Sequence, residues 1–178
     1  IHGRASPTNG YTGWAGCSVL ARVGTGIALV NGHTFPDIVE HRLQMALVNA
    51  ILKGGLYCLS AYLIEGEGLS DDNKTILEYV VVPLNSLKAP WIMAGDWNLT
   101  LELVAAFGFL QMVDGILIQP NSPTRHQKTF DFFVVHRSIA HAVVGVQRVD
   151  GVGVKPHHPA RLVLRGDARR FAVRQLVH

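Results

Sequence analysis

Three short motifs contain the polar residues best suited to chemistry. Asp96 and Asn98 occur in Gly-Asp-x-Asn directly after the apolar run 91–94, Asp131 stands among phenylalanines, and His157 lies in Pro-His-His-Pro. A carboxylate can orient water, an amide can position a substrate, and an imidazole held by a second carboxylate can exchange a proton. Two alternatives remain: Asp96 caps the following helix while Asn98 supports the turn, or Asp131 faces water on an edge strand.

Short apolar and β-branched runs predict strands, and two segments have features of helices. A long helix is expected to begin after Ser70, whose hydroxyl can cap it, and to kink or end early at Pro83. A short helix is expected over 100–106. The expected strands cover 14–23, 26–30, 42–51, 56–63, 91–94, 115–118, 130–135, 142–149 and 161–164.

These elements predict an α/β (α+β) fold in which two sheets pack on each other with helices outside. The length of 178 residues suits one domain, placed at 13–166 between a loop-like segment 1–12 and a basic tail 167–178. A hydrophobic content of 48% argues against disorder, and no apolar run approaches the ~20 residues that span a bilayer, so no membrane contact is expected. Cys17 and Cys58 match no metal spacing and predict buried free thiols, typical of an intracellular, reducing compartment.

The carboxyl-terminal third of the chain is cationic. Residues 121–178 carry ten basic and three acidic side chains, whereas residues 1–120 carry six and ten. Arg161 and Arg165 belong to this part, which could attract a polyanion such as DNA or RNA. A solvated strand edge and tail would have the same composition.

The order of the motifs resembles the endonuclease/exonuclease/phosphatase superfamily, the DNase I-like metal-dependent phosphodiesterases, and within it the endonuclease domains of retroelements. The similarity covers about residues 14–164, and segments 66–70 and 123–135 look like retroelement members in particular. It implies a DNase I-like two-sheet sandwich flanked by helices. It also implies phosphodiester hydrolysis of nucleic acid with Mg²⁺ or Mn²⁺ as cofactor.

The resemblance implies a role for each motif residue. Asp96 would orient or activate the attacking water and take part in binding the metal, and Asn98 would position the substrate. Asp131 would hold His157 and fix its tautomer. Tyr62 matches the family position whose side chain approaches the scissile phosphate, although a core tyrosine with its hydroxyl at the rim fits equally well.

The resemblance also selects among the basic residues. Spacing from Pro159 selects His157 rather than His158 as the catalytic imidazole. His158 is expected to be exposed, and a transition-metal site made by the histidine pair lacks a third nearby ligand. Independently of the resemblance, the cationic carboxyl-terminal third makes Arg161 and Arg165 the expected substrate-binding cations.

The chain departs from the family pattern in two ways. Pro156 stands where the family has an aspartate that helps bind the metal, and no Gln-Glu motif with its principal metal ligand occurs before Trp14. Glu65 lies in the wrong context to replace that ligand. The N-terminal strands of the family are therefore expected to be missing, metal binding to be weak and activity to be impaired.

Three functions remain in competition. The first is a truncated retroelement-like endonuclease. The second is a catalytically inactive relic that still binds nucleic acid through its basic third. The third is a phosphoesterase acting on a small nucleotide or lipid phosphate, because one fold can serve many substrates.

Overall fold

The computed structural model describes residues 16–30, 42–49, 51–153 and 155–165. Both expected domain boundaries, at 12–13 and 166–167, lie outside these residues. The elements, in chain order, are β1 (Ile27–Leu29), β2 (Leu43–Val48), β3 (Leu56–Tyr62), α2 (Asp71–Ser86), β4 (Trp91–Asp96), α3 (Leu101–Ala106), α4 (Phe109–Met112), β5 (Gly115–Ile118), β6 (Asp131–His136), the 3₁₀ helix η1 (Arg137–Ala142), β7 (Val143–Arg148) and β8 (Ala160–Leu164).

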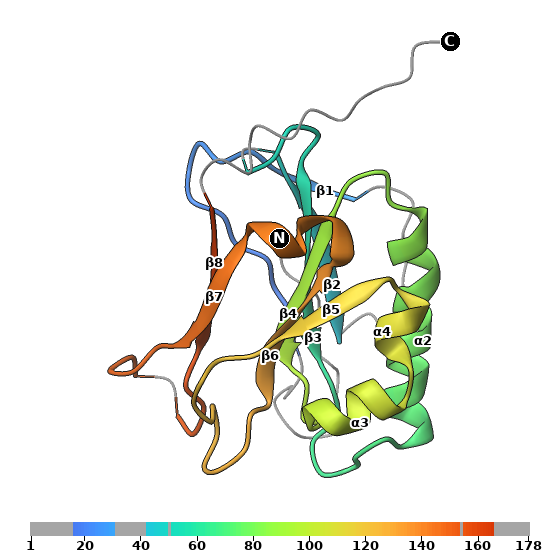
Figure 1. Cartoon of the computed structure of the whole chain (residues 1–178), viewed down its shortest axis with the longest axis vertical. Helices are drawn as coiled ribbons and strands as arrows, with labels where there is room; N and C mark the ends of the chain where they lie inside the picture. The colour runs from blue at the N-terminus through green and yellow to red at the C-terminus, as the bar shows by residue number, and fades with distance from the viewer. Residues whose placement is uncertain (1–15, 31–41, 50, 154, 166–178) are drawn as a thin grey trace, which may run out of the picture.

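Six strands form one mixed sheet in the order β1-β2-β3-β4-β6-β5, and β7 pairs with β8 in a second sheet. Strands β3 and β4 are the one parallel pair described in the large sheet, because α2 returns the chain between them. Figure 1 shows the helices α2, α3 and α4 on one side of the large sheet and β7–β8 on the other. The predicted α/β architecture with two packed sheets is confirmed.

The large sheet is buried on both faces. Toward the helices, Leu59, Met93 and Val134 form one register row across three strands and pack with Ile76 and Val80 of α2. These five side chains are at most 3% exposed, so this face supplies much of the hydrophobic stabilisation.

The opposite face packs against the second sheet. Ile92 and Val135, which are register partners, contact the cluster that includes Leu162 and Leu164 of β8 and Ile139 of η1. Side chains alternate along a strand, so even-numbered residues of β4 and odd-numbered residues of β6 point to this face. The candidate site residues at the ends of these strands lie on it too.

Helix α2 begins as expected but does not end at Pro83. Ser70 Oγ accepts a hydrogen bond from the Asn73 N–H at 3.2 Å, which caps the helix, and the helix continues to Ser86. Pro83 falls in the last turn, where its missing N–H leaves only the carbonyl of the half-exposed Tyr79 for water to satisfy. Burial of Leu84, 2% exposed, favours continuing the helix past Pro83.

The strand expected at 14–23 is wrong for its described part, residues 16–23. Only an isolated bridge at Ser18 occurs there, and Leu20 and Val23 are 73% and 100% exposed. Cys17 is the buried apolar residue of this segment, 5% exposed, so the described part lacks the row of buried side chains that would hold a strand in the core. The partner expected at 26–30 is present as the short strand β1, which pairs with β2 instead.

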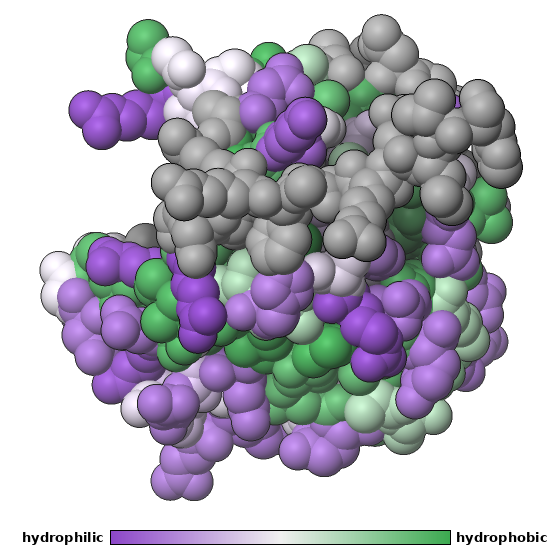
Figure 2. Space-filling model, turned by 45° about the horizontal axis from the view of Figure 1, so that its top comes forward, coloured by the Kyte–Doolittle hydropathy of each residue, from purple (hydrophilic) through white to green (hydrophobic). Residues whose placement is uncertain are grey.

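The surface has mixed polarity. The face shown in Figure 2 has a hydrophobic area in its lower half that is bordered by hydrophilic side chains. Single exposed apolar residues such as Val82, 76% exposed on α2, are common on protein surfaces and need no partner. Among the described residues, no helix combines the length and apolar character needed to cross a bilayer.

Candidate active site

Three of the predicted site residues form one row across the centre of the large sheet. Tyr62 of β3 is the register partner of Asp96 of β4, and Asp96 is in turn the partner of Asp131 of β6. Residues paired in this way point to the same face. The sheet therefore brings together a phenol and two carboxylates that are far apart in sequence.

Gly95 allows the central strands to approach closely enough for this row. A Cβ at this position would lie 1.8 Å from the carbonyl oxygen of Ala61 on β3, so no other residue fits without separating β3 from β4. The glycine of Gly-Asp-x-Asn is thus required by the sheet itself.

His157 completes the cluster from the loop between β7 and β8. Its Nδ1 lies 2.8 Å from Asp131 Oδ2, and its Nε2 lies 3.6 Å from Asp96 Oδ2. The three side chains are 17–22% exposed, so the imidazole sits between the carboxylates at the edge of solvent. A small cavity of about 240 Å³ lies beside them and is lined by both aspartates and Pro159.

Asn98 combines a structural contact with a position at the site. It is 8% exposed, adopts a left-handed backbone with φ 46°, and its Nδ2 donates to the Leu63 carbonyl at 2.9 Å. Its backbone N–H donates to Asp96 Oδ1 at 3.2 Å. Asn98 therefore supports the turn and also lines a cavity next to the cluster. Helix α3 has no side-chain cap at its N-cap residue Thr100, and Asp96 accepts the N–H of Asn98 instead of capping this helix.

Thr124 is a site residue that sequence reasoning missed. It is fully buried, and its hydroxyl accepts the backbone N–H groups of Phe130 and Asp131, each at 3.0 Å. Its carbonyl accepts the backbone N–H of His158 at 2.7 Å. One residue thus fixes the start of β6 and the loop that carries His157. The only sequence signal was a threonine in a Pro-Thr turn.

Burial and charge shape the electrostatics of the cluster. Burial raises the pKa of Asp96, and neighbouring Asp131 adds to this rise, whereas His157 lowers it. Burial, followed by the charge of Asp96, raises the pKa of Tyr62, so the phenol stays neutral. The guanidinium of Arg42 lies 5.0 Å from the centre of the Tyr62 ring, and this cation–π contact fixes the ring at the rim of the site.

The donor set fits a weakly held divalent cation. Ligand atoms of Asp96, Asp131 and His157 lie within 4.8 Å of one another. Asp131 is already engaged by the imidazole, which leaves Asp96 as the carboxylate for an ion. Mg²⁺ is often bound by one or two carboxylates, with water and substrate phosphate completing its octahedron.

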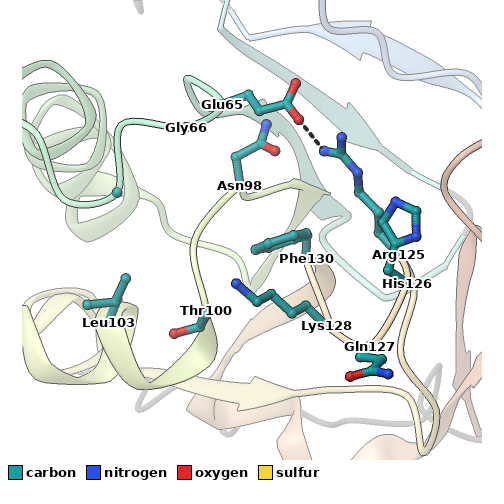
Figure 3. A pocket seen from close by; sticks show the side chains of 11 residues that line it. Glu65, Gly66, Asn98, Thr100, Leu103, Arg125, His126, Gln127, Lys128 and Phe130 are labelled. Atoms are coloured by element: carbon teal, nitrogen blue, oxygen red, sulfur yellow. Dashed lines mark ion pairs between the residues drawn. The ribbon is translucent and has the colours of Figure 1, made fainter.

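A larger cavity of about 630 Å³, drawn in Figure 3, is lined in part by Asn98, whose backbone N–H contacts Asp96 of the cluster. Asn98 and Phe130, which flank the two strand ends, form part of its wall. The turn opposite contributes basic side chains, among them Arg125 and Lys128, and Arg125 is ion-paired with Glu65 across the mouth. Its volume lies within the range of cavities that bind small molecules.

The structure adds Arg125 to the cations that the sequence indicated, and the binding role of Arg161 and Arg165 stays a prediction. Leu162 and Leu164 of β8 pack inward, so Arg161 points to the outer face of that strand, and both Arg161 and Arg165 are exposed. Neither lines a described cavity. Arg125 does so, and its charge acts on both Asp96 and Tyr62. A basic turn directly before the Asp131 strand was the signal available for it.

His158 and Pro156 do not belong to the cluster of Asp96, Asp131 and His157. The His158 side chain is 44% exposed and its Nδ1 lies 3.0 Å from Asp150 Oδ1, so it does not join His157 in a metal site. Pro156 is exposed and offers no carboxylate. Among the described residues, the cluster holds no glutamate.

The arrangement can now be compared with known proteins. No protein-family model matches the sequence, and no curated protein does. Among solved structures, the endonuclease domain of TRAS1, a telomere-specific non-LTR retrotransposon, has a TM-score of 0.61 at 12% identity, over 79% of this chain and 67% of that one. The chain has a DNase I-like fold.

Two further DNase I-like structures show the same fold at low identity. The AP endonuclease LMAP from Leishmania major has a TM-score of 0.57 at 16% identity, over 71% of this chain and 55% of that one. The cytolethal distending toxin of Haemophilus ducreyi has a TM-score of 0.52 at 16% identity, over 68% of this chain. This chain spans about half of that toxin chain, 52% of its length. Similarity at this level of identity establishes the fold alone. The activity has to be argued from the residues of the site.

Proposed function

We propose that this DNase I-like chain hydrolyses phosphodiester bonds in nucleic acid, at the cluster of Asp96, Asp131 and His157. One observation carries the proposal: a single imidazole lies between two half-buried carboxylates that the sheet holds in register. Burying two acids beside each other costs free energy unless a partner or a ligand compensates them. A cluster built for catalysis gives a reason for that cost.

Each residue has a role that its position suits. Asp131 holds the Nδ1–H of His157, which directs Nε2 toward Asp96, where it would donate to a phosphoryl oxygen. Asp96 orients the attacking water with the oxygen that faces Nε2. The second N–H of Asn98 Nδ2 and the hydroxyl of Tyr62 contact the substrate phosphate from the two sides of Asp96.

Asp96 would also hold Mg²⁺ or Mn²⁺. When bound, such an ion neutralises the charge that develops on the phosphoryl oxygens. Because a single carboxylate is free for it, binding is expected to be weak and to depend on the substrate phosphate.

The larger cavity suits a nucleotide next to the scissile bond. Arg125 and Lys128 provide cations for a phosphate, and Phe130 provides a ring on which a base can stack. The ion pair with Glu65 uses Nη1 of Arg125, which leaves the other N–H donors of the guanidinium for a phosphate. The exposed Arg161 and Arg165 can add a longer-range attraction from the outer face of β8.

Plasmid cleavage in Mg²⁺ or Mn²⁺ tests the proposal. Asp96→Asn and His157→Ala should each lower the rate by roughly 10²–10⁴-fold, the usual contribution of a general acid or base. The matched controls are Asp114→Asn and His136→Ala, whose side chains pair with Arg137 and Ser138 away from the cluster. Cleavage that is equally fast in the cluster and control variants would refute the proposal.

A second function is favoured by Pro156, which leaves the cluster without a further carboxylate. The chain would then bind nucleic acid through Arg125 and Lys128 without cleaving it. Binding that falls steeply with salt, with no metal-dependent cleavage in the wild type, would support this function instead. Faster turnover of a soluble phosphodiester than of DNA would point to a small substrate.

A further inference from the structure

A second set of charged residues surrounds the loop that carries His157. This loop connects β7 to β8 and is closed at its base by the Val149 N–H, which donates to the Pro159 carbonyl at 2.7 Å. His157 lies just before the end of the loop, so its place over Asp131 depends on what holds the loop down. The contact with Asp131 alone would leave most of the loop free.

The side chains of Asp150 and His158 pair within this loop, and Arg148 links Asp150 to the neighbouring turn. His158 Nδ1 lies 3.0 Å from Asp150 Oδ1, and Asp150 in turn faces Arg148 with Nε–Oδ1 at 3.0 Å and Nη2–Oδ2 at 3.3 Å. Arg148 Nη1 donates to the Pro123 carbonyl at 3.0 Å. The backbone N–H of His158 donates to the Thr124 carbonyl, which gives the loop a second contact with the turn at 123–124.

Thr124 contacts both this set of residues and Asp131. The Thr124 hydroxyl accepts the N–H of Asp131, while the Thr124 carbonyl accepts the N–H of His158. The acid and the imidazole are therefore located against the same buried residue. A shift of the loop relative to Thr124 would change the distance between His157 and Asp131 directly.

We propose that Arg148, Asp150 and His158 form a clamp that positions His157 against Asp131. These are positioning residues, since none of them lines a described cavity or touches the acids of the cluster. Their side chains are 30%, 60% and 44% exposed, and ion pairs this exposed stabilise a fold very little. The clamp acts on the geometry of the site rather than on the stability of the domain.

The decisive variant is Asp150→Ala, which removes the centre of the clamp. Asp114→Ala is its matched control, because Asp114 also pairs with an exposed arginine, Arg137, and its loss changes the net charge by the same amount. Asp150→Asn keeps one oxygen acceptor and should restore part of the effect. All three substitutions are at exposed positions, so the variants should fold.

The primary measurement is the NMR signal of the His157 imidazole, in particular the Nδ1 proton held by Asp131. Asp150→Ala should broaden or shift this signal, Asp150→Asn should do so less, and Asp114→Ala should leave it unchanged. An unchanged signal in Asp150→Ala overturns the clamp. This readout does not require activity, and a purely local surface ion pair would not affect it.

The effect on rate rests on the proposed function. If the cluster is catalytic, Asp150→Ala should lower kcat by roughly 10²-fold with little change in KM, as expected for a misplacement of about 1 Å. If His157→Ala cleaves normally while Asp150→Ala still changes the imidazole signal, the proposed function fails and the clamp stands. If His157→Ala abolishes cleavage but Asp150→Ala leaves the imidazole signal unchanged, the clamp fails and the proposed function stands.

Discussion

Replacing Thr124 with valine should destabilise the domain far more than replacing it with serine. Valine keeps the volume of threonine but cannot accept the N–H groups of Phe130 and Asp131, which lie 3.0 Å from the hydroxyl in a fully buried position. An unsatisfied buried donor costs about 1–3 kcal/mol, so two of them should cost about 2–6 kcal/mol. Serine keeps the acceptor and loses one methyl group, at a cost of about 1 kcal/mol.

Urea unfolding followed by tryptophan fluorescence measures this difference, since Trp97 and Trp91 are buried in the same core. The Thr124→Val midpoint should fall well below that of Thr124→Ser, with similar m-values for both variants. A loss of this size is a large part of the total stability of a domain, which is about 5–15 kcal/mol. The free energies should be compared near pH 7, where no thiol ionises.

The reasoning would be refuted by a valine variant within about 0.5 kcal/mol of the serine variant, the scatter typical of a neutral surface substitution. That result would mean that the two N–H groups find water or other acceptors once the hydroxyl is gone. It would also remove the argument that Thr124 locates Asp131. A lower m-value in Thr124→Val alone would instead indicate a change in the unfolded or native ensemble.

Three further predictions concern the strand pair, the thiols and the cavity. Gly95→Ala should cost more than about 3 kcal/mol of unfolding free energy in urea titrations, because the new methyl would meet the Ala61 carbonyl at 1.8 Å. Burial raises the pKa of Cys17 and of Cys58 to about 11, so unfolded thiols lose protons near their ordinary pKa of 9.0 while folded ones keep them. Urea midpoints should therefore fall as pH rises from 9 toward 11, and both thiols should resist alkylation of the native protein near pH 8. Arg125→Ala should weaken oligonucleotide binding and lower its salt dependence by about one counterion, as measured by anisotropy titrations.

The sequence predicted the central architecture because that part depends on local patterns. The apolar run before Asp96 and the phenylalanines around Asp131 could be read as buried strands, and both are strands in the structure. Ser70 could be read as a cap for the same reason. Of the two outcomes expected at Pro83, the early end is wrong, because the burial of Leu84, a tertiary effect, outweighs a local preference.

The placement of charges could not be predicted in this way. The basic third of the chain predicts Arg161 and Arg165 as substrate-binding cations, and the structure places both on the exposed surface, where that role stays a prediction. Arg125 is separated from Asp96 by a long stretch of chain. The turn 124–128, in which the N–H groups of Thr124 and Arg125 donate to the Lys128 carbonyl, brings Arg125 to the cavity. Net charge records how many cations are present and carries no information about which face they occupy.

The same distinction bears on the two competing functions. The proposed hydrolysis would require the contact of His157 with Asp131 at the start of β6 and the proposed clamp that places His157, whereas binding would require cations that tolerate small displacements. Loosening the loop between β7 and β8 should therefore abolish cleavage before it weakens binding. Asp150→Ala that binds an oligonucleotide with wild-type affinity but cleaves slowly would place the chain among the enzymes; equal loss of both properties would argue that the loop simply completes a binding surface.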